Sequence, residues 1–176
     1  ILIKFIDAQD NLSIQVHPTE AYAHRHENDN GKNEMWYIVD AEEDAFIYVG
    51  FNRDTNRKEV SRRVKEKSIE EILNKIPVRK GDSFFIPAGT VHAIGAGCLI
   101  CEIQQTSNIT YRLYDYGRLG ADGKPRELNL KKALDVLNYC KMEIEKDEES
   151  GLSHIGAVSK KTLAKTNWFT VPKYEV

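Results

Sequence analysis

The sequence predicts a mainly β fold, a sandwich or small barrel with two peripheral helical segments. Eight short stretches are rich in β-branched and aromatic residues, and Gly, Asn, Asp and Pro separate them. Two further stretches place apolar residues at helical spacing. Many short strands close together are typical of a two-sheet or closed β architecture.

The predicted strands follow one another over most of the first 116 residues. They are ILIKFIDA (1–8), LSIQVH (12–17), NEMWYIVDA (33–41), DAFIYVGF (44–51), DSFFIPAG (82–89), TVHAIGAG (90–97), CLICEIQQ (98–105) and ITYRLYDY (109–116). The second strand alternates strictly, with Leu12, Ile14 and Val16 on one face and Ser13, Gln15 and His17 on the other. Its polar face is therefore either wet surface or the lining of an interior.

Two segments show a helical pattern. Between about residues 55 and 76, apolar residues recur at helical spacing among charges, and Pro77 follows. Ser68 and Glu71 resemble a capping box, which predicts two helices with a break near Lys67. The second segment, about residues 129–139, has Asn129 as a plausible N-cap and one apolar stripe. We expect both segments to pack against the strands without a chemical role.

The domain boundaries follow from these patterns. Residues 1–142 form the principal predicted domain, residues 143–161 an acidic linker that is poor in apolar residues, and residues 162–176 a final strand. The chain begins with Ile rather than Met and opens within a predicted strand. This start indicates a fragment of a longer protein.

Composition excludes several classes of protein. The 176 residues fit one domain, and 25 basic against 27 acidic residues give a formal net charge of −2. The chain therefore lacks the basic footprint of a nucleic-acid-binding protein, and no apolar run is long enough to span a membrane. Three cysteines leave an odd thiol, which favours a reducing cytoplasm. Cys98 and Cys101 form C-x-x-C on a predicted strand, where they face opposite sides and cannot grip one metal ion.

The stretch GDSFFIPAGTVHAI, residues 81–94, carries the strongest chemical pattern. Its spacing (Gly, five residues, Pro, one residue, Gly, two residues, His92) resembles the second motif of the cupin superfamily, small β-barrels that hold a metal among strand side chains. The first cupin motif supplies two ligands one residue apart and then a carboxylate, which Gln15, His17 and Glu34 match. Two imidazoles, a carboxylate and an amide oxygen suit Zn²⁺. The polar face of the second strand is then the lumen of the barrel.

A second His-x-His sequence is a decoy. His24 and His26 precede Glu27 in EAYAHRHENDNGKN, which is polar, reads as helix or loop and lacks strand alternation. We therefore expect no native metal site there, and His154, which has no partners in the sequence, is expected to be solvated.

Four motifs together resemble the type I mannose-6-phosphate isomerases, in the short form found in bacteria. They are LIKFIDAQDNLSIQVHP, GKNEMWYIVDA, GDSFFIPAGTVHAIGAG and EIQQTSNITYRLYDYGR, in the family's order between about residues 1 and 137. The resemblance implies zinc on Gln15, His17, Glu34 and His92, a catalytic arginine at Arg112, and an active-site lysine at Lys32. It also implies that residues 162–176 begin a truncated second cupin-like domain.

The resemblance implies interconversion of mannose 6-phosphate and fructose 6-phosphate through a cis-enediolate. Arg112 stays protonated, so we expect it to bind an enediolate oxygen or the phosphate, unless its strand face lies at the surface. The proton carrier stays open between Glu102 and a metal-bound water. One departure is Asn108, where the family usually has Asp.

Two rival functions remain, and neither needs a macromolecular partner. Two histidines and a carboxylate also form the facial triad of Fe(II) oxygenases, which cupin dioxygenases use. Asn108 and the truncation would also suit a metal-bearing module that binds a sugar phosphate without turnover. Exposed sheet edges would favour self-association of the fragment.

Overall fold

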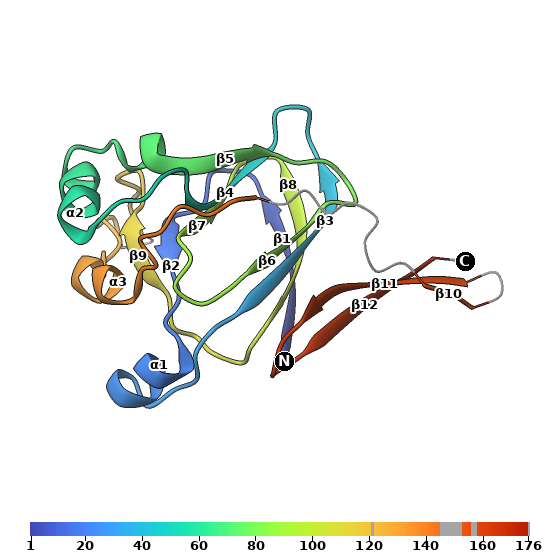
Figure 1. Cartoon of the computed structure of the whole chain (residues 1–176). Helices are drawn as coiled ribbons and strands as arrows, with labels where there is room; N and C mark the ends of the chain where they lie inside the picture. Colours follow the sequence, from blue (N-terminus) through green and yellow to red (C-terminus); the bar gives the residue numbers. More distant parts are fainter. Residues whose placement is uncertain (121, 145–152, 156–157, 176) are drawn as a thin grey trace.

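The structure, a computed structural model, describes residues 1–120, 122–144, 153–155 and 158–175. Two antiparallel sheets face each other, and a smaller third sheet lies beside them (Figure 1). The prediction of a mainly β, cupin-type sandwich is confirmed. Helices α2 and α3 cover the outer side of one sheet, and α1 lies at one end of the sandwich.

Each of the two main sheets is built from strands that are distant in sequence. The first has the order β1 (Leu2–Ala8), β8 (Cys98–Gln104), β3 (Glu34–Ala41) and β6 (Ser83–Ile86). The second has the order β5 (Leu73–Pro77), β4 (Phe46–Phe51), β7 (His92–Ile94), β2 (Ile14–Val16) and β9 (Tyr111–Tyr114). All eight predicted strands are present, and only β5 was not predicted among these nine.

The five-stranded sheet is buried on both faces. Ile14 and Val16 point outward, are fully buried, and join the apolar cluster beneath α2 and α3. Ser13 and His17, on the other face of the same strand, are also buried at 5% and 1% exposure. The polar face of β2 is therefore interior. Burying each apolar side chain contributes about 1.5–3 kcal/mol, which fixes the orientation of the strand.

The helices are α1 (Glu20–His26), α2 (Arg57–Lys65) and α3 (Leu130–Val136). In α2 the side chain of Asn56 accepts a hydrogen bond from the Glu59 N–H, and Val60 and Val64 are buried against the sheet. Helices α2 and α3 both pack against the five-stranded sheet, as expected. The third helix is shorter than the predicted 129–139, and Asn129 makes no side-chain cap. Its Oδ1 instead accepts a hydrogen bond from the Arg112 N–H.

The prediction of a second helix up to residue 76 is wrong. A break does occur at Lys67, whose φ is 57°, but a single 3-10 turn (Ile69–Ile72) follows and the chain then enters β5. Ser68 makes no side-chain cap, because the Glu71 N–H donates to the backbone carbonyl oxygen of Ser68 at 3.2 Å, and the Glu71 carboxylate pairs with Arg63 at 2.6 Å. Backbone pairing of β5 with β4 replaces the helical hydrogen bonds.

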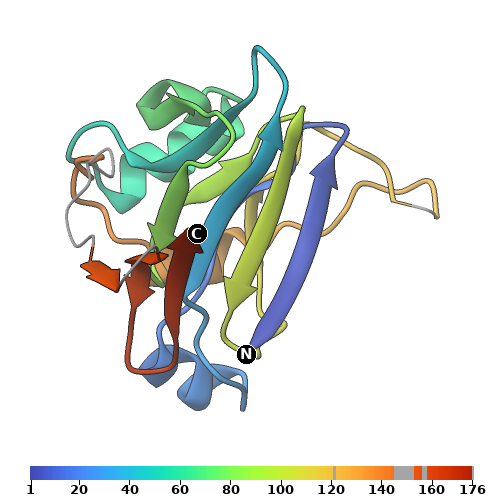
Figure 2. The same ribbon diagram turned by 90° about the vertical axis from the view of Figure 1, so that its right-hand side faces the viewer.

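The C-terminal region forms the third sheet, in the order β10 (Ser153–Ile155), β11 (Val158–Lys165) and β12 (Thr170–Glu175). The single strand predicted over 162–176 is therefore a hairpin, which turns between Thr166 and Phe169. About half of the predicted linker lies outside the described residues, but β10 and the start of β11 lie inside it. The hairpin packs on the outer face of the first sheet, where Phe169 and Ala164 meet Met35 (Figure 2).

The sequence excludes a membrane-spanning segment and a metal site at Cys98 and Cys101, and the structure bears on both points. Among the described residues, no helix has the length and apolar character needed to cross a membrane. Cys98 is buried in the core between the sheets, whereas Cys101 points to the other face of β8 and is partly exposed. The C-x-x-C sequence therefore does not form a metal site.

Candidate metal centre

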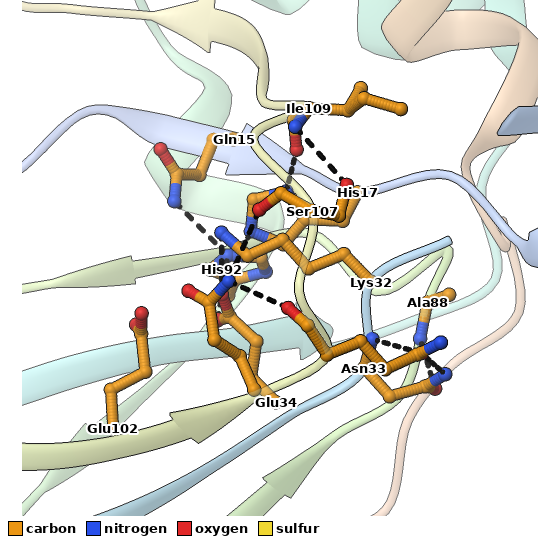
Figure 3. A network of polar contacts seen from close by, with 12 residues as sticks. Gln15, His17, Lys32, Asn33, Glu34, Ala88, His92, Glu102, Ser107 and Ile109 are labelled. Atoms are coloured by element: carbon orange, nitrogen blue, oxygen red, sulfur yellow. Dashed lines mark hydrogen bonds and ion pairs between the residues drawn. The ribbon is translucent and has the colours of Figure 1, made fainter. Parts of the chain in front are cut away.

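Three side chains converge at one end of the interior between the sheets (Figure 3). His17 follows β2, Glu34 begins β3, and His92 begins β7. Their candidate ligand atoms all lie within 4.8 Å of one another. All three residues are at most 1% exposed, so their side chains are shielded from bulk solvent.

The sheet registers explain why these distant residues meet. Gln15 on β2 pairs directly with His92 on β7, so both side chains leave the same face of the five-stranded sheet. Glu34 comes from the facing sheet, where it pairs with Gln104 and Ile86. The structure therefore brings His17, Glu34 and His92 together, as the sequence predicts.

Several polar atoms at this point lack a hydrogen-bond partner. His17 Nε2 lies 3.2 Å from Glu34 Oε1 and His92 Nε2 lies 3.7 Å from Glu34 Oε2. Neither His17 Nε2 nor either Glu34 oxygen makes a hydrogen bond within the described part of the chain, although Lys32 Nζ forms an ion pair with Glu34 Oε1 at 2.9 Å. Buried polar atoms left without partners are costly, and a cation between His17 Nε2 and Glu34 Oε2 would satisfy both. The residues present therefore fit a divalent metal ion.

Both imidazoles are oriented to offer Nε2. His17 Nδ1 lies 2.8 Å from the Ile109 carbonyl oxygen, and His92 Nδ1 lies 2.9 Å from that of Thr90. A carbonyl can only accept, so each Nδ1 carries the proton and each Nε2 keeps its lone pair. Such backbone partners are the usual support of metal-binding histidines.

The surroundings of His92 and Glu34 shift the pKa values of both groups. Burial, together with the neighbouring His17, lowers the pKa of His92 to about 3, so its imidazole is neutral near pH 7. Burial opposes the ionisation of Glu34, but the facing His17 and the nearby His92 and Lys32 hold the pKa of this carboxyl well below its usual value. A neutral imidazole beside a carboxylate is the state that binds a metal ion.

Gln15, the fourth predicted ligand, lies beside the cluster. Its Nε2 is 3.3 Å from His92 Nε2, and its Oε1 accepts a hydrogen bond from Ser13 at 3.3 Å. A half-turn of the amide exchanges the two atoms and brings the oxygen to the side of His92. Gln15 is therefore placed to contribute an amide oxygen.

The two predicted cationic residues come from different segments: Lys32 precedes β3, and Arg112 lies on β9. Lys32 is 5% exposed, and its Nζ pairs with Glu34 Oε1 at 2.9 Å. Arg112 is opposite Gln15 in the β2–β9 register, which places both on the interior face and excludes the surface alternative. The Arg112 Nε is buried and, within the described residues, has no hydrogen-bond partner.

Sequence reasoning missed part of the interior polar surface. Lys4, on edge strand β1, contacts Glu102 Oε1 at 3.0 Å, and Trp36 Nε1 donates to Glu102 Oε2 at 3.3 Å. The Trp36 ring also meets the His92 ring edge-on at 5.4 Å between centroids. The signal was present in ILIKFIDA, where Lys4 shares the strand face of Ile6 and Ala8.

The remaining predictions concern residues outside the cluster. His24 lies on α1 with 59% of its side chain exposed and pairs with Glu20 one turn earlier, so it does not join the metal cluster. Asn108 is exposed in the loop between β8 and β9, next to Ile109. The side chain of His154 lies outside the described residues.

Known proteins with similar sequences are mannose-6-phosphate isomerases. The chain is 49% identical over 138 residues to the mannose-6-phosphate isomerase ManA of Bacillus subtilis, a match that covers 78% of this chain and 44% of that protein. It is 38% identical over 176 residues to the mannose-6-phosphate isomerase of Streptococcus mutans, covering 100% of this chain and 54% of that protein. The chain thus spans about half the length of the curated relatives it matches. No family model matches.

Solved structures agree with the sequence matches. The crystal structure of the Bacillus subtilis mannose 6-phosphate isomerase superimposes with a TM-score of 0.90 at 34% identity, covering 99% of this chain and 55% of that one. A putative mannosephosphate isomerase from Archaeoglobus fulgidus shares the fold, with a TM-score of 0.68 at 23% identity. By sequence and by fold, the chain belongs to the mannose-6-phosphate isomerase family.

Proposed function

We propose that this chain carries the metal centre of a zinc-dependent aldose–ketose isomerase, which interconverts mannose 6-phosphate and fructose 6-phosphate. The observation that supports this most is the buried group of His17, Glu34 and His92 with its unpartnered ligand atoms. The relatives' names, one of them from a protein 49% identical, give mannose 6-phosphate, and fructose 6-phosphate is the ketose isomer of that sugar. A small, acidic sugar phosphate also suits a site whose nearest cations are Lys32 and Arg112.

The residues would share the work as follows. His17, Glu34, His92 and Gln15 would hold Zn²⁺. When bound, Zn²⁺ supplies Lewis-acid stabilisation of the negative charge that develops on the sugar oxygens. Arg112 would bind an enediolate oxygen or the phosphate, because its guanidinium offers a fork of donors that stays charged.

Lys32 would act through Glu34. Its ammonium lies 2.9 Å from Glu34 Oε1, so it helps to hold the carboxylate ionised while Oε1 also faces His17 and Oε2 faces His92. This second cation also favours an anionic intermediate nearby, since positive charge placed where negative charge develops is usually the largest contribution in such sites.

Glu102 would carry the proton. Isomerisation removes a proton from C2 of the aldose and returns one to C1, while the hydroxyl proton moves from O2 to O1. Glu102 is 5% exposed and has one oxygen on Lys4 and the other on Trp36, whose ring meets that of His92. Because Glu34 is the proposed metal ligand, the carboxylate of Glu102 would be free to act as a general acid and base.

The decisive experiment combines metal analysis with a coupled assay for fructose 6-phosphate on the purified chain. Stoichiometric zinc with conversion of mannose 6-phosphate supports the proposal. Glu34→Gln, which keeps the side-chain size and removes the charge, should lose both. Bound iron with O₂ consumption would instead identify a dioxygenase. Zinc and sugar-phosphate binding without conversion would identify a binding module, a result that would reject the isomerase.

A further inference from the structure

A buried amide lies between two residues of the proposed centre (Figure 3). Asn33 separates Lys32 from Glu34 in the sequence and is 9% exposed. Its Oδ1 accepts a hydrogen bond from the backbone N–H of Ala88 at 2.9 Å. Its Nδ2 and its own backbone N–H both donate to Gln105 Oε1, at 2.6 and 2.9 Å. Asn33 therefore joins two loops that are far apart in sequence.

The first of these loops is the turn of residues 87–90, between β6 and β7. Within this turn, Gly89 donates its N–H to the carbonyl oxygen of His17 at 2.8 Å. The carbonyl oxygen of Thr90 lies 2.9 Å from His92 Nδ1 and orients that ring. One short turn therefore contacts both histidines of the cluster.

The second loop holds Gln105, which is 5% exposed. Its Nε2 donates to Glu20 Oε2 at 3.0 Å, and a carboxylate can only accept. Glu20 thereby fixes which end of the Gln105 amide faces Asn33. The network is then satisfied at each of these atoms, as buried polar groups need to be.

The sheets alone do not fix the spacing of the three ligands. Glu34 belongs to the four-stranded sheet, whereas His92 belongs to the five-stranded sheet and His17 directly follows β2 of that sheet. Strand hydrogen bonds set positions within each sheet, and the apolar core between them is non-directional. The Asn33–Ala88 bond is directional, and it connects the start of β3 to the turn that leads into β7.

We propose that Asn33 is a positioning residue, oriented by Gln105, which sets the distance of Glu34 from His17 and His92 so that one metal ion fits between them. Asn33 touches neither the ion nor the substrate and acts through its neighbours. The inference rests on the proposed metal site. Loss of a group that supports metal ligands typically lowers affinity 10–100-fold.

The test compares Asn33→Ala with Asn11→Ala. The Asn11 Oδ1 accepts a hydrogen bond from the backbone N–H of Ala96 at 2.9 Å, so the bond type matches, but it lies at the other end of β7. Three quantities are measured: Zn²⁺ affinity by competition with a chromophoric chelator, the visible absorption of the Co²⁺ form, and thermal unfolding of the metal-free protein.

We expect Asn33→Ala to weaken Zn²⁺ binding about 10–100-fold and to change the Co²⁺ spectrum. Asn11→Ala should keep the affinity and spectrum of the unchanged chain even where its unfolding temperature falls equally. Gln105→Met, which keeps the side-chain length and removes the amide, should shift both metal readouts in the same direction as Asn33→Ala. This second variant keeps the test valid should Asn33→Ala fail to fold.

Unchanged metal readouts in Gln105→Met and in a folded Asn33→Ala, or equal losses in Asn11→Ala, would overturn the positioning role. Zinc binding by the unchanged chain without isomerase activity would reject the proposed reaction while the difference between Asn33→Ala and Asn11→Ala still upholds the positioning role. Absence of zinc binding in the unchanged chain would overturn both.

Discussion

Gln15 and His92 are directly paired across β2 and β7, and Gln15 Nε2 lies 3.3 Å from His92 Nε2. Strand pairing therefore places the side-chain amide of Gln15 next to the imidazole that is proposed to bind metal. Because strand pairing fixes this contact, the geometry of the site depends on sheet register as much as on the ligands themselves.

Replacing His92 by Ala should abolish stoichiometric zinc binding. The change removes one of two imidazoles from the proposed site and should lower metal affinity by several kcal/mol. Metal content after dialysis against a weak chelator measures this loss. His24→Ala is the matched control, because His24 is 59% exposed on α1 and should keep full zinc content. Equal zinc in the His92→Ala protein would contradict the assignment of this ligand.

Replacing Arg112 by Ala should leave zinc bound and reduce isomerase turnover by at least a hundredfold, if one charge-stabilising donor is lost. Metal analysis beside the coupled assay separates the two effects. Arg79→Ala removes an arginine whose side chain is 90% exposed and should leave both quantities unchanged. Full turnover in Arg112→Ala would show that Arg112 has no part in the reaction.

Replacing Gly89 by Ala should destabilise the protein by more than the same change at Gly81. Both glycines have positive φ, 89° and 96°, so both substitutions carry backbone strain of about 1 kcal/mol. Only at Gly89 would the new Cβ approach another group, the Val136 carbonyl oxygen at 3.1 Å. Urea unfolding of the two variants gives the difference. Equal losses would mean that the neighbouring carbonyl yields without cost.

Asp115 should contribute stability that depends on pH. Burial opposes its ionisation, but hydrogen bonds from Arg126 and Arg118, at 2.6 and 2.5 Å, hold the pKa of Asp115 below 3.8. A carboxyl with a lowered pKa in the folded state stabilises the protein above its unfolded pKa, and this stability is lost as the pH falls through the folded pKa.

We therefore expect Asp115→Asn to lower the free energy of unfolding by about 1–2 kcal/mol at pH 7, with a smaller difference as the pH falls below 3.8. Urea unfolding at pH 7 and at pH 3 measures it. Asp10→Asn, at an exposed position, should show little change at either pH. A difference for Asp115→Asn that stays constant with pH would refute the ionic contribution.

Much of the fold could be predicted because the strands are short and strongly patterned. In LSIQVHP the alternation placed His17 and Gln15 on one face, and the turn at Pro87 and Gly89 placed His92 at the start of the next strand. The local sequence pattern mispredicts the secondary structure where pairing with a neighbouring strand determines it. The residues around Ile72 and Ile76 have spacing that suits a helix, but the edge of β4 recruits them as a strand.

The sequence predicts the residues that meet in the candidate site better than it predicts their surroundings. His17, Glu34 and His92 stand out because metal-binding residue types recur in a known spacing. Asn33 and Gln105 carry no such signal, since an amide becomes informative only when its partners are known. Lys4 was overlooked for a related reason: a single charge in an apolar strand acquires meaning from the Glu102 carboxylate 98 residues away.

The double burial of β2 leaves this strand no tolerance for slippage. A shift of the β2 register by one residue would turn Ile14 and Val16 toward the polar interior between the two sheets. It would also turn His17 toward the apolar cluster beneath α2 and α3. Molecules with the wrong register would lose core packing and the arrangement of the proposed metal ligands in the same event. Selection for a stable chain and selection for a working centre thus act on the same three-residue ladder.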